Sequence, residues 1–136
     1  MPRRMTTTKE GTHKALKNSS YESLVVSWLM QDGWQVFLPI LENGHKTDIL
    51  ISDGPNYHRI QIKTVEASTE DHLLMNKWKN GNVDVIVAFA RNGDWGYVMP
   101  AFTQDKRKLN AQGHIKFNQT KNDFLKAFHN LDTEQV

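Results

Sequence analysis

The chain has 136 residues, a formal net charge of +2, an apolar content of 38% and no cysteine. This length fits one domain with a single hydrophobic core, and the apolar content excludes an intrinsically disordered chain. Without cysteine the chain can form neither a disulfide framework nor a thiolate zinc site. No apolar stretch approaches the about 20 residues of a membrane helix. We therefore predict a soluble, cytoplasmic protein with no membrane partner.

The N-terminal part is predicted to form an arm followed by a helix. Residues 1–18 are polar and basic, which favours a flexible basic arm, or a poorly ordered start of the helix, ahead of a single folded domain at 19–136. Between Ser19 and Asp32 the apolar residues recur at the spacing of an amphipathic helix. Gly33 is predicted to end this helix, because glycine readily takes the left-handed conformation that commonly follows a last helical turn.

Three strands are predicted after this helix. The first runs from Trp34 to Pro39, the second from Asp48 to Ser52 and the third from His58 to Thr64. The sequence Asp-Gly-Pro-Asn at 53–56 has the composition of a turn, so the second and third strands are expected to be neighbours.

The second half of the chain is predicted to begin with a helix at 69–80, followed by strands at 83–90 and 95–99 that a hairpin turn joins. A basic loop, a short strand at 114–117 and a last helix from about Thr120 are predicted to follow. The segment 83–90 is the most apolar of these strands, which favours a central place in the sheet. The predicted fold class is α/β of the α+β type, with the order α-β-β-β-α-β and a mixed central sheet flanked by helices.

A candidate site lies on the second and third predicted strands. Side chains alternate along a strand, so Gln61 and Lys63 share one face while Ile60 and Ile62 share the other. A neighbouring strand that opens with Asp48 can bring its carboxylate to the Gln61 amide oxygen and the Lys63 ammonium. Such a trio suits a hard divalent cation beside a phosphate and suggests a metal-dependent nuclease. The alternative is structural: a solvated strand face, with Asp48 in the turn that precedes a strand.

Glu22 has two interpretations of equal weight. It lies beside the apolar stripe of the first predicted helix, from which it could add a second carboxylate to the pocket of Asp48. Alternatively, Ser19-x-x-Glu22 fits a capping box, in which Glu22 accepts a backbone hydrogen bond at the start of the helix.

Together these residues resemble the PD-(D/E)XK nuclease superfamily and, within it, the small homing-endonuclease branch that includes group I intron-encoded enzymes with a Gln-x-Lys motif. The superfamily name implies an acid two positions before the lysine, where this chain has Gln61. The resemblance spans residues 19–100 and implies a restriction-endonuclease-like core. It rests on the helix with Glu22 and on the motifs Gly33-Trp34-x-Val36, Asp48-Ile-Leu-Ile and Arg59-Ile-Gln61-Ile-Lys63-Thr64.

The resemblance implies a metal-dependent DNA endonuclease of the homing, site-specific type. A Holliday junction resolvase-like nuclease and a catalytically silent DNA-binding module of the same fold are the alternatives. The implied cofactor is Mg²⁺, with Mn²⁺ as a substitute. Glu22, Asp48, Gln61 and Lys63 are the expected catalytic residues, and the metal ligands would be the two carboxylates, Gln61 and the backbone carbonyl of Ile62.

Interrupted basic patches can neutralise DNA phosphates. The expected partner is double-stranded DNA, branched DNA included. A homodimer or homotetramer is expected, because one site cuts one strand and two copies would place two sites on opposite strands. The residues expected to contact DNA are His45, Lys46, Arg59, Lys77, Lys79, Lys106, Arg107 and Lys108.

Overall fold

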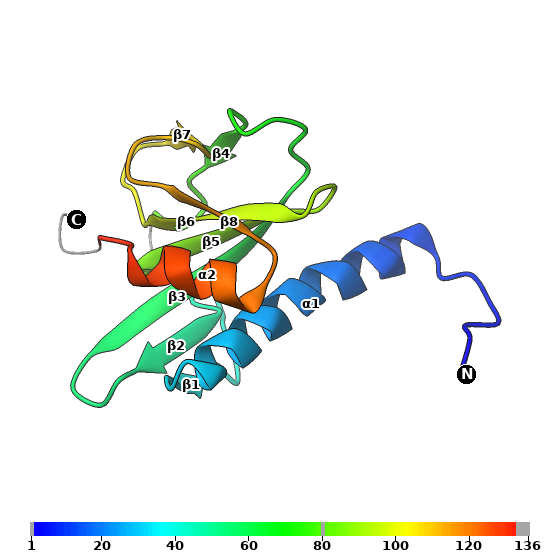
Figure 1. The fold of residues 1–136 in the computed structure, drawn as a ribbon, viewed down its shortest axis with the longest axis horizontal. Coiled ribbons are helices and arrows are strands. Elements are labelled where there is room, and N and C mark those ends of the chain that lie inside the picture. The colour runs from blue at the N-terminus through cyan, green and yellow to red at the C-terminus, as the bar shows by residue number, and fades with distance from the viewer. Residues whose placement is uncertain (1, 80, 133–136) are drawn as a thin grey trace.

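The computed structural model describes residues 2–79 and 81–132, which form a six-stranded sheet, a separate two-stranded ribbon and two helices (Figure 1). Within these residues no helix is long and apolar enough to cross a membrane. The elements are α1 (Glu10–Gln31), β1 (Gln35–Phe37), β2 (Ile49–Ser52), β3 (Tyr57–Val65), β4 (Leu73–Met75), β5 (Val85–Ala90), β6 (Trp95–Pro100), β7 (Lys106–Lys108), β8 (Ile115–Asn118) and α2 (Lys121–His129).

The large sheet is mixed, with the strand order β1-β2-β3-β5-β6-β8. Strands β3 and β5 are parallel, and every other neighbouring pair is antiparallel. All six residues of β5 are buried, so the prediction that this apolar segment is central is confirmed. The predicted class, a mixed sheet with flanking helices, is confirmed as well.

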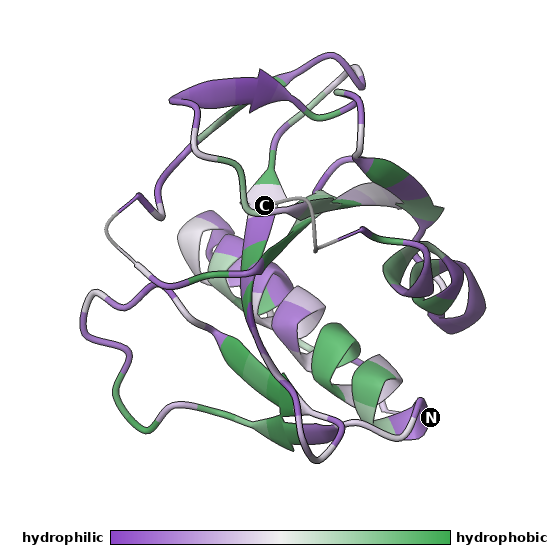
Figure 2. Ribbon diagram, turned by 90° about the vertical axis from the view of Figure 1, so that its left-hand side faces the viewer, coloured by the Kyte–Doolittle hydropathy of each residue, from purple (hydrophilic) through white to green (hydrophobic). Residues whose placement is uncertain are grey.

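The two faces of the sheet are covered differently. Both helices pack on one face, where Val25 and Leu29 of α1 and Phe124 of α2 join the apolar side chains of the strands. On the other face, Leu74 of β4 and the loop residue Trp78 belong to a second apolar cluster. Figure 2 shows the strand at the top of the view as hydrophilic, whereas the strands below it mix hydrophobic and hydrophilic residues. The chain therefore forms three layers: helices, sheet, and ribbon with loops.

Helix α1 begins at Glu10, well before the predicted start at Ser19. Residues 10–18 are thus helical, and their prediction as an arm is wrong. Polar contacts to a distant turn hold this part of the helix, since Lys17 Nζ donates to the Arg91 carbonyl oxygen at 2.8 Å and Asn18 Oδ1 accepts from Arg91 Nη2 at 2.9 Å. Arg91 lies far along the chain, which explains why hydrophobic periodicity did not reveal these turns.

The end of α1 follows the prediction. Gly33 has a φ of 101°, a conformation that glycine adopts without the steric cost of a Cβ. Its N–H donates to the Met30 carbonyl oxygen, and the N–H of Trp34 donates to that of Leu29, both at 3.0 Å. These two bonds satisfy carbonyls of the last turn and set the direction of the chain into β1.

The predicted helix at 69–80 is wrong over the described part of that range, and residue 80 lies outside it. The segment instead contributes the short strand β4, which pairs with β7 in place of the predicted basic loop. Trp78 is only 3% exposed, and its Nε1–H donates to the Phe102 carbonyl oxygen at 3.1 Å. Leu74 and Trp78 are therefore buried in one cluster with Phe102 and Leu109, which the local sequence pattern does not encode.

Candidate active site

The candidate site lies where β3 extends beyond its neighbour β2. Ile49, the first residue of β2, pairs with Ile60, so the later residues of β3 have no β2 partner. Asp48 stands directly before β2, and its N–H donates to the Ile60 carbonyl oxygen at 2.9 Å. Its side-chain Oδ2 accepts from the Ile62 N–H at 2.7 Å. The Asp48 carboxylate thus takes the place that the backbone carbonyl of a longer β2 would have as acceptor. This hydrogen bond fixes the carboxylate at the open edge of β3.

Three of the predicted catalytic residues line one hollow of about 260 Å³ at this edge. Glu22 comes from α1, Asp48 from the start of β2, and Lys63 from β3. Glu22 is an interior residue of α1, so it cannot cap the start of the helix, and the capping-box interpretation is wrong. The full lining consists of Asn18, Ser19, Glu22, Asp48, Ile62, Lys63 and Thr64.

The charges in this hollow perturb one another. Burial raises the pKa of Asp48, although the Ile62 N–H and the Lys63 ammonium partly offset the effect. Burial also raises the pKa of Glu22, and the nearby Asp48 raises it further. For Lys63, burial lowers the pKa, Asp48 raises it and neighbouring lysines lower it again. The site therefore combines two carboxylates that are costly to ionise with a lysine that holds its proton less tightly than usual.

Gln61, the fourth predicted catalytic residue, is buried and is not among the residues that line this hollow. It is 6% exposed, and its Oε1 has no hydrogen-bond partner among the residues that the structure describes. The alternative of a solvated strand face is therefore wrong for Gln61. Continuing the β2–β3 register by one residue places Asp48 opposite Gln61. A buried acceptor without a donor is rare and costly, and a cation is one group that could satisfy it.

The oxygen donors here differ from a cluster of acids and histidines. Within residues 2–79 and 81–132 there is no group of three or more His, Cys, Asp or Glu that could hold a metal ion. A cation at this edge would instead draw on Asp48, Glu22, the Gln61 amide oxygen and the Ile62 carbonyl. This set consists entirely of oxygen atoms, the ligand type of hard divalent cations.

The residues predicted to contact DNA fall into separate regions. Lys46 and Lys77 lie close enough to Lys63 to lower its pKa. His45 and Arg59 line a different hollow of about 280 Å³, together with apolar residues that follow β1. Lys79 forms an ion pair with Asp105, and Lys106, Arg107 and Lys108 make up β7.

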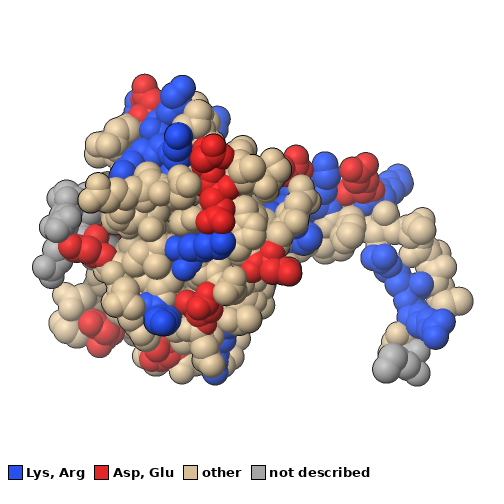
Figure 3. Space-filling model, turned by 45° about the horizontal axis from the view of Figure 1, so that its top comes forward, with Lys and Arg blue, Asp and Glu red and all other residues tan. Residues whose placement is uncertain are grey.

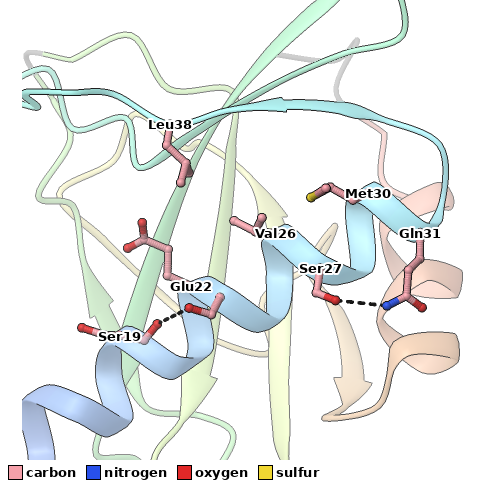
Figure 4. A pocket seen from close by; sticks show the side chains of 8 residues that line it. Ser19, Glu22, Val26, Ser27, Met30, Gln31 and Leu38 are labelled. Carbon is pink, nitrogen blue, oxygen red and sulfur yellow. Dashed lines mark hydrogen bonds between the residues drawn. The ribbon is translucent and has the colours of Figure 1, made fainter.

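Sequence reasoning missed some residues of the site and an adjoining groove. Asn18 and Thr64 line the hollow; Asn18 could have been found, because it lies four residues before Glu22 on the same face of the helix. A groove of about 490 Å³ shares Ser19 and Glu22 with the site and continues along α1 to Met30. Figure 4 shows these side chains on the face of α1 that looks toward the segment after β1.

No protein-family model matches the sequence, and neither does any curated protein. Among solved structures, the bacterial homing endonuclease I-Ssp6803I superposes with a TM-score of 0.52. The chain has the fold of a homing endonuclease. Sequence identity is 19%, over 85% of this chain and 78% of that chain. The similarity confirms the fold expected from the resemblance, while the superfamily and the relation to group I introns stay predictions.

Proposed function

We propose that the protein is a metal-dependent DNA endonuclease that hydrolyses phosphodiester bonds at specific sites. The observation that carries the proposal is the meeting of Glu22, Asp48 and Lys63 in one hollow at the open edge of β3, in this fold. A module that only binds DNA has no need of a half-buried lysine that shares a hollow with two carboxylates. Such an arrangement costs stability, and titratable groups whose pKa is shifted by burial and by neighbouring charges are typical of catalytic sites.

The donor set fits Mg²⁺, with Mn²⁺ as its substitute. Mg²⁺ in enzymes that act on phosphates is commonly held by one or two carboxylates and by substrate oxygens. Asp48 and Glu22 would supply the carboxylates, and the Gln61 Oε1, which has no partner among the described residues, would supply a neutral oxygen. The Ile62 carbonyl is the fourth donor in the proposal. When bound, such an ion neutralises charge on the phosphate and makes a water molecule more acidic.

Each of the other roles follows from the surroundings of a side chain. Lys63 would orient the attacking water and stabilise the extra negative charge of the pentacovalent phosphate. The hydrogen bond from the Ile62 N–H holds the Asp48 carboxylate in one orientation. Glu22 faces the same hollow from the helix and completes its negative wall.

The proposal includes two copies of the chain acting on one duplex, since one hollow of this kind cuts one strand. The segment after β1 offers an apolar surface for pairing, because Leu38, Ile40 and Leu41 are all exposed. Exposed apolar side chains that are contiguous in this way are typical of protein–protein contacts.

The test is cleavage of supercoiled plasmid, linear duplex and a four-way junction with Mg²⁺, with Mn²⁺ and with EDTA. Asp48→Asn and Lys63→Met should each reduce cleavage by about 10²-fold or more while DNA binding and the melting temperature are retained. Glu10→Gln and Lys121→Ala are the matched controls, since both residues are exposed and lie outside the hollow.

The three substrates separate the proposal from its alternatives. Cleavage of the junction alone would support a resolvase-like nuclease. Metal-independent cleavage, full activity of either site variant, or binding of every substrate without cleavage would refute the proposed endonuclease.

A further inference from the structure

The two-stranded ribbon formed by β4 and β7 presents one face to solvent. Leu73 pairs with Lys108 and Met75 with Lys106 in antiparallel register. Residues paired across two strands share a face, and successive residues alternate. These four side chains are all exposed, whereas Leu74 between them is buried in the core.

Arg107 belongs to the inner side of the ribbon. Its guanidinium lies over the Phe102 ring, 5.9 Å from the centroid, and its Nη2 donates to the Gln112 carbonyl oxygen at 3.1 Å. Of the three consecutive basic residues of β7, two therefore face outward and the third anchors the ribbon. Arg107 thus has structural contacts, and the DNA contact expected of it stays a prediction.

The outer face of the ribbon mixes several chemistries. Lysines and arginines gather at the top of the molecule, over the ribbon, with an acidic side chain among them (Figure 3). Lys106 lies near Asp105, which is paired with Lys79, and Lys108 lies near Asp71, which accepts from the Thr69 hydroxyl. A surface that only neutralises phosphates gains nothing from carboxylates. Base edges in the major groove, in contrast, offer acceptors, donors and the thymine methyl group, which match lysine, aspartate and apolar side chains.

The ribbon is connected to the candidate active site by a short segment. Lys77, two residues after Met75, lies close enough to Lys63 to lower its pKa. Further on, this segment packs tightly against the loop before Asp48: a Cβ at Gly81 would lie 2.6 Å from the His45 carbonyl oxygen. A duplex whose phosphate reaches Lys63 would therefore pass the base of the ribbon.

We propose that the β4–β7 ribbon enters the major groove beside the cleaved phosphate and reads base edges there. Paired strands lie about 4.8 Å apart, and the groove is about 12 Å wide, so a two-stranded ribbon with its side chains fits. Lys106 and Lys108 are separated by two residues of strand, about 7 Å, which equals about two base-pair steps of 3.4 Å. Each copy of the chain thus reads two base pairs two steps apart through these lysines, with Leu73 and Met75 directed at the groove beside them. This inference rests on the proposed DNA substrate.

The experiment is selection from a randomised duplex library, carried out twice. Cleaved duplexes are sequenced for the wild-type protein, and bound duplexes are sequenced for Asp48→Asn. Lys106→Ala and Lys108→Ala should each reduce the preference at one base pair by about tenfold to a hundredfold, at positions two steps apart. Lys121→Ala removes the same charge from α2 and should leave the profile unchanged. The two lysines are proposed to contact bases and not phosphates. The salt dependence of DNA affinity should therefore be nearly the same in each lysine variant as in the wild type.

The outcomes keep the two proposals distinct. Unchanged profiles for both lysine variants, or a loss of affinity that is uniform across sequences and lowers the salt dependence, would overturn the reading role and leave the nuclease standing. Sequence-selective binding that depends on Lys106 and Lys108, without any cleavage, would support the ribbon and refute the nuclease. A wild-type protein that binds no duplex would refute both.

Discussion

Substitution of Gln61 by methionine separates the stability of the fold from the chemistry of the site. Methionine has nearly the same length and volume but no polar oxygen, so packing against the neighbouring strands is retained. In the present protein the Gln61 Oε1 is buried without a partner among the described residues. Such an acceptor costs about 1–3 kcal/mol, so Gln61→Met should be more stable than the wild type by about that amount when no divalent cation is present.

The measurement is urea and thermal unfolding in EDTA and in increasing Mg²⁺. For a domain of this size, each kcal/mol corresponds to about 4 °C in melting temperature. Metal at about a hundred times its dissociation constant should stabilise the wild type by about 2.7 kcal/mol, and Gln61→Met by clearly less. Gln61→Glu should show the opposite pattern, because a third carboxylate destabilises the metal-free site and tightens metal binding.

Gln35→Met is the matched control, since Gln35 is an exposed strand residue on β1. It should change neither stability nor metal response appreciably. If Gln61→Met were no more stable than the wild type and responded to Mg²⁺ as the wild type does, Gln61 would be a spectator and its place among the metal ligands would be refuted.

Three further predictions concern Glu22 and the surface after β1. Glu22→Gln should reduce cleavage by about 10²-fold or more, with Glu10→Gln as the control. Because the folded state raises the pKa of Glu22 above its usual 4.5, the folded protein retains a proton that the unfolded chain has released just above that pH. Wild-type stability relative to Glu22→Gln should therefore fall as pH rises through and above 4.5 in urea titrations, and a constant difference would contradict this charge effect. In light scattering at micromolar concentration the protein should form dimers or tetramers, and Ile40→Asp should weaken them; a monomer with and without DNA would count against paired cleavage.

Much of the local structure was predictable, because it depends on interactions within a few residues. The left-handed conformation at Gly33 ended α1 where the sequence indicated. The last helix begins after Thr120, whose side chain accepts from the Asp123 N–H at 3.4 Å. The alternation that placed Gln61 and Lys63 on one face of a strand needs only backbone geometry.

Other features depended on contacts between distant parts of the chain. Lys17 and Asn18 of α1 are held by Arg91, and β4 is a strand because it pairs with β7. Neither partner is encoded in the local periodicity of the segment it stabilises. For this reason a helix was predicted where a strand forms, and an arm where a helix forms.

The sequence by itself determined which chemical groups the site contains and that Asp48 would stand next to the Gln-x-Lys strand, since a short turn forces β2 and β3 to be neighbours. Only the tertiary structure excluded the capping role of Glu22 and placed it in one hollow with Asp48, because both depend on where α1 begins and how it lies over the sheet. Only the tertiary structure buried Gln61, because β4, β7 and their loops cover that face. Side-chain burial and pKa depend on everything packed around a residue, and those neighbours come from parts of the chain that local pattern does not connect.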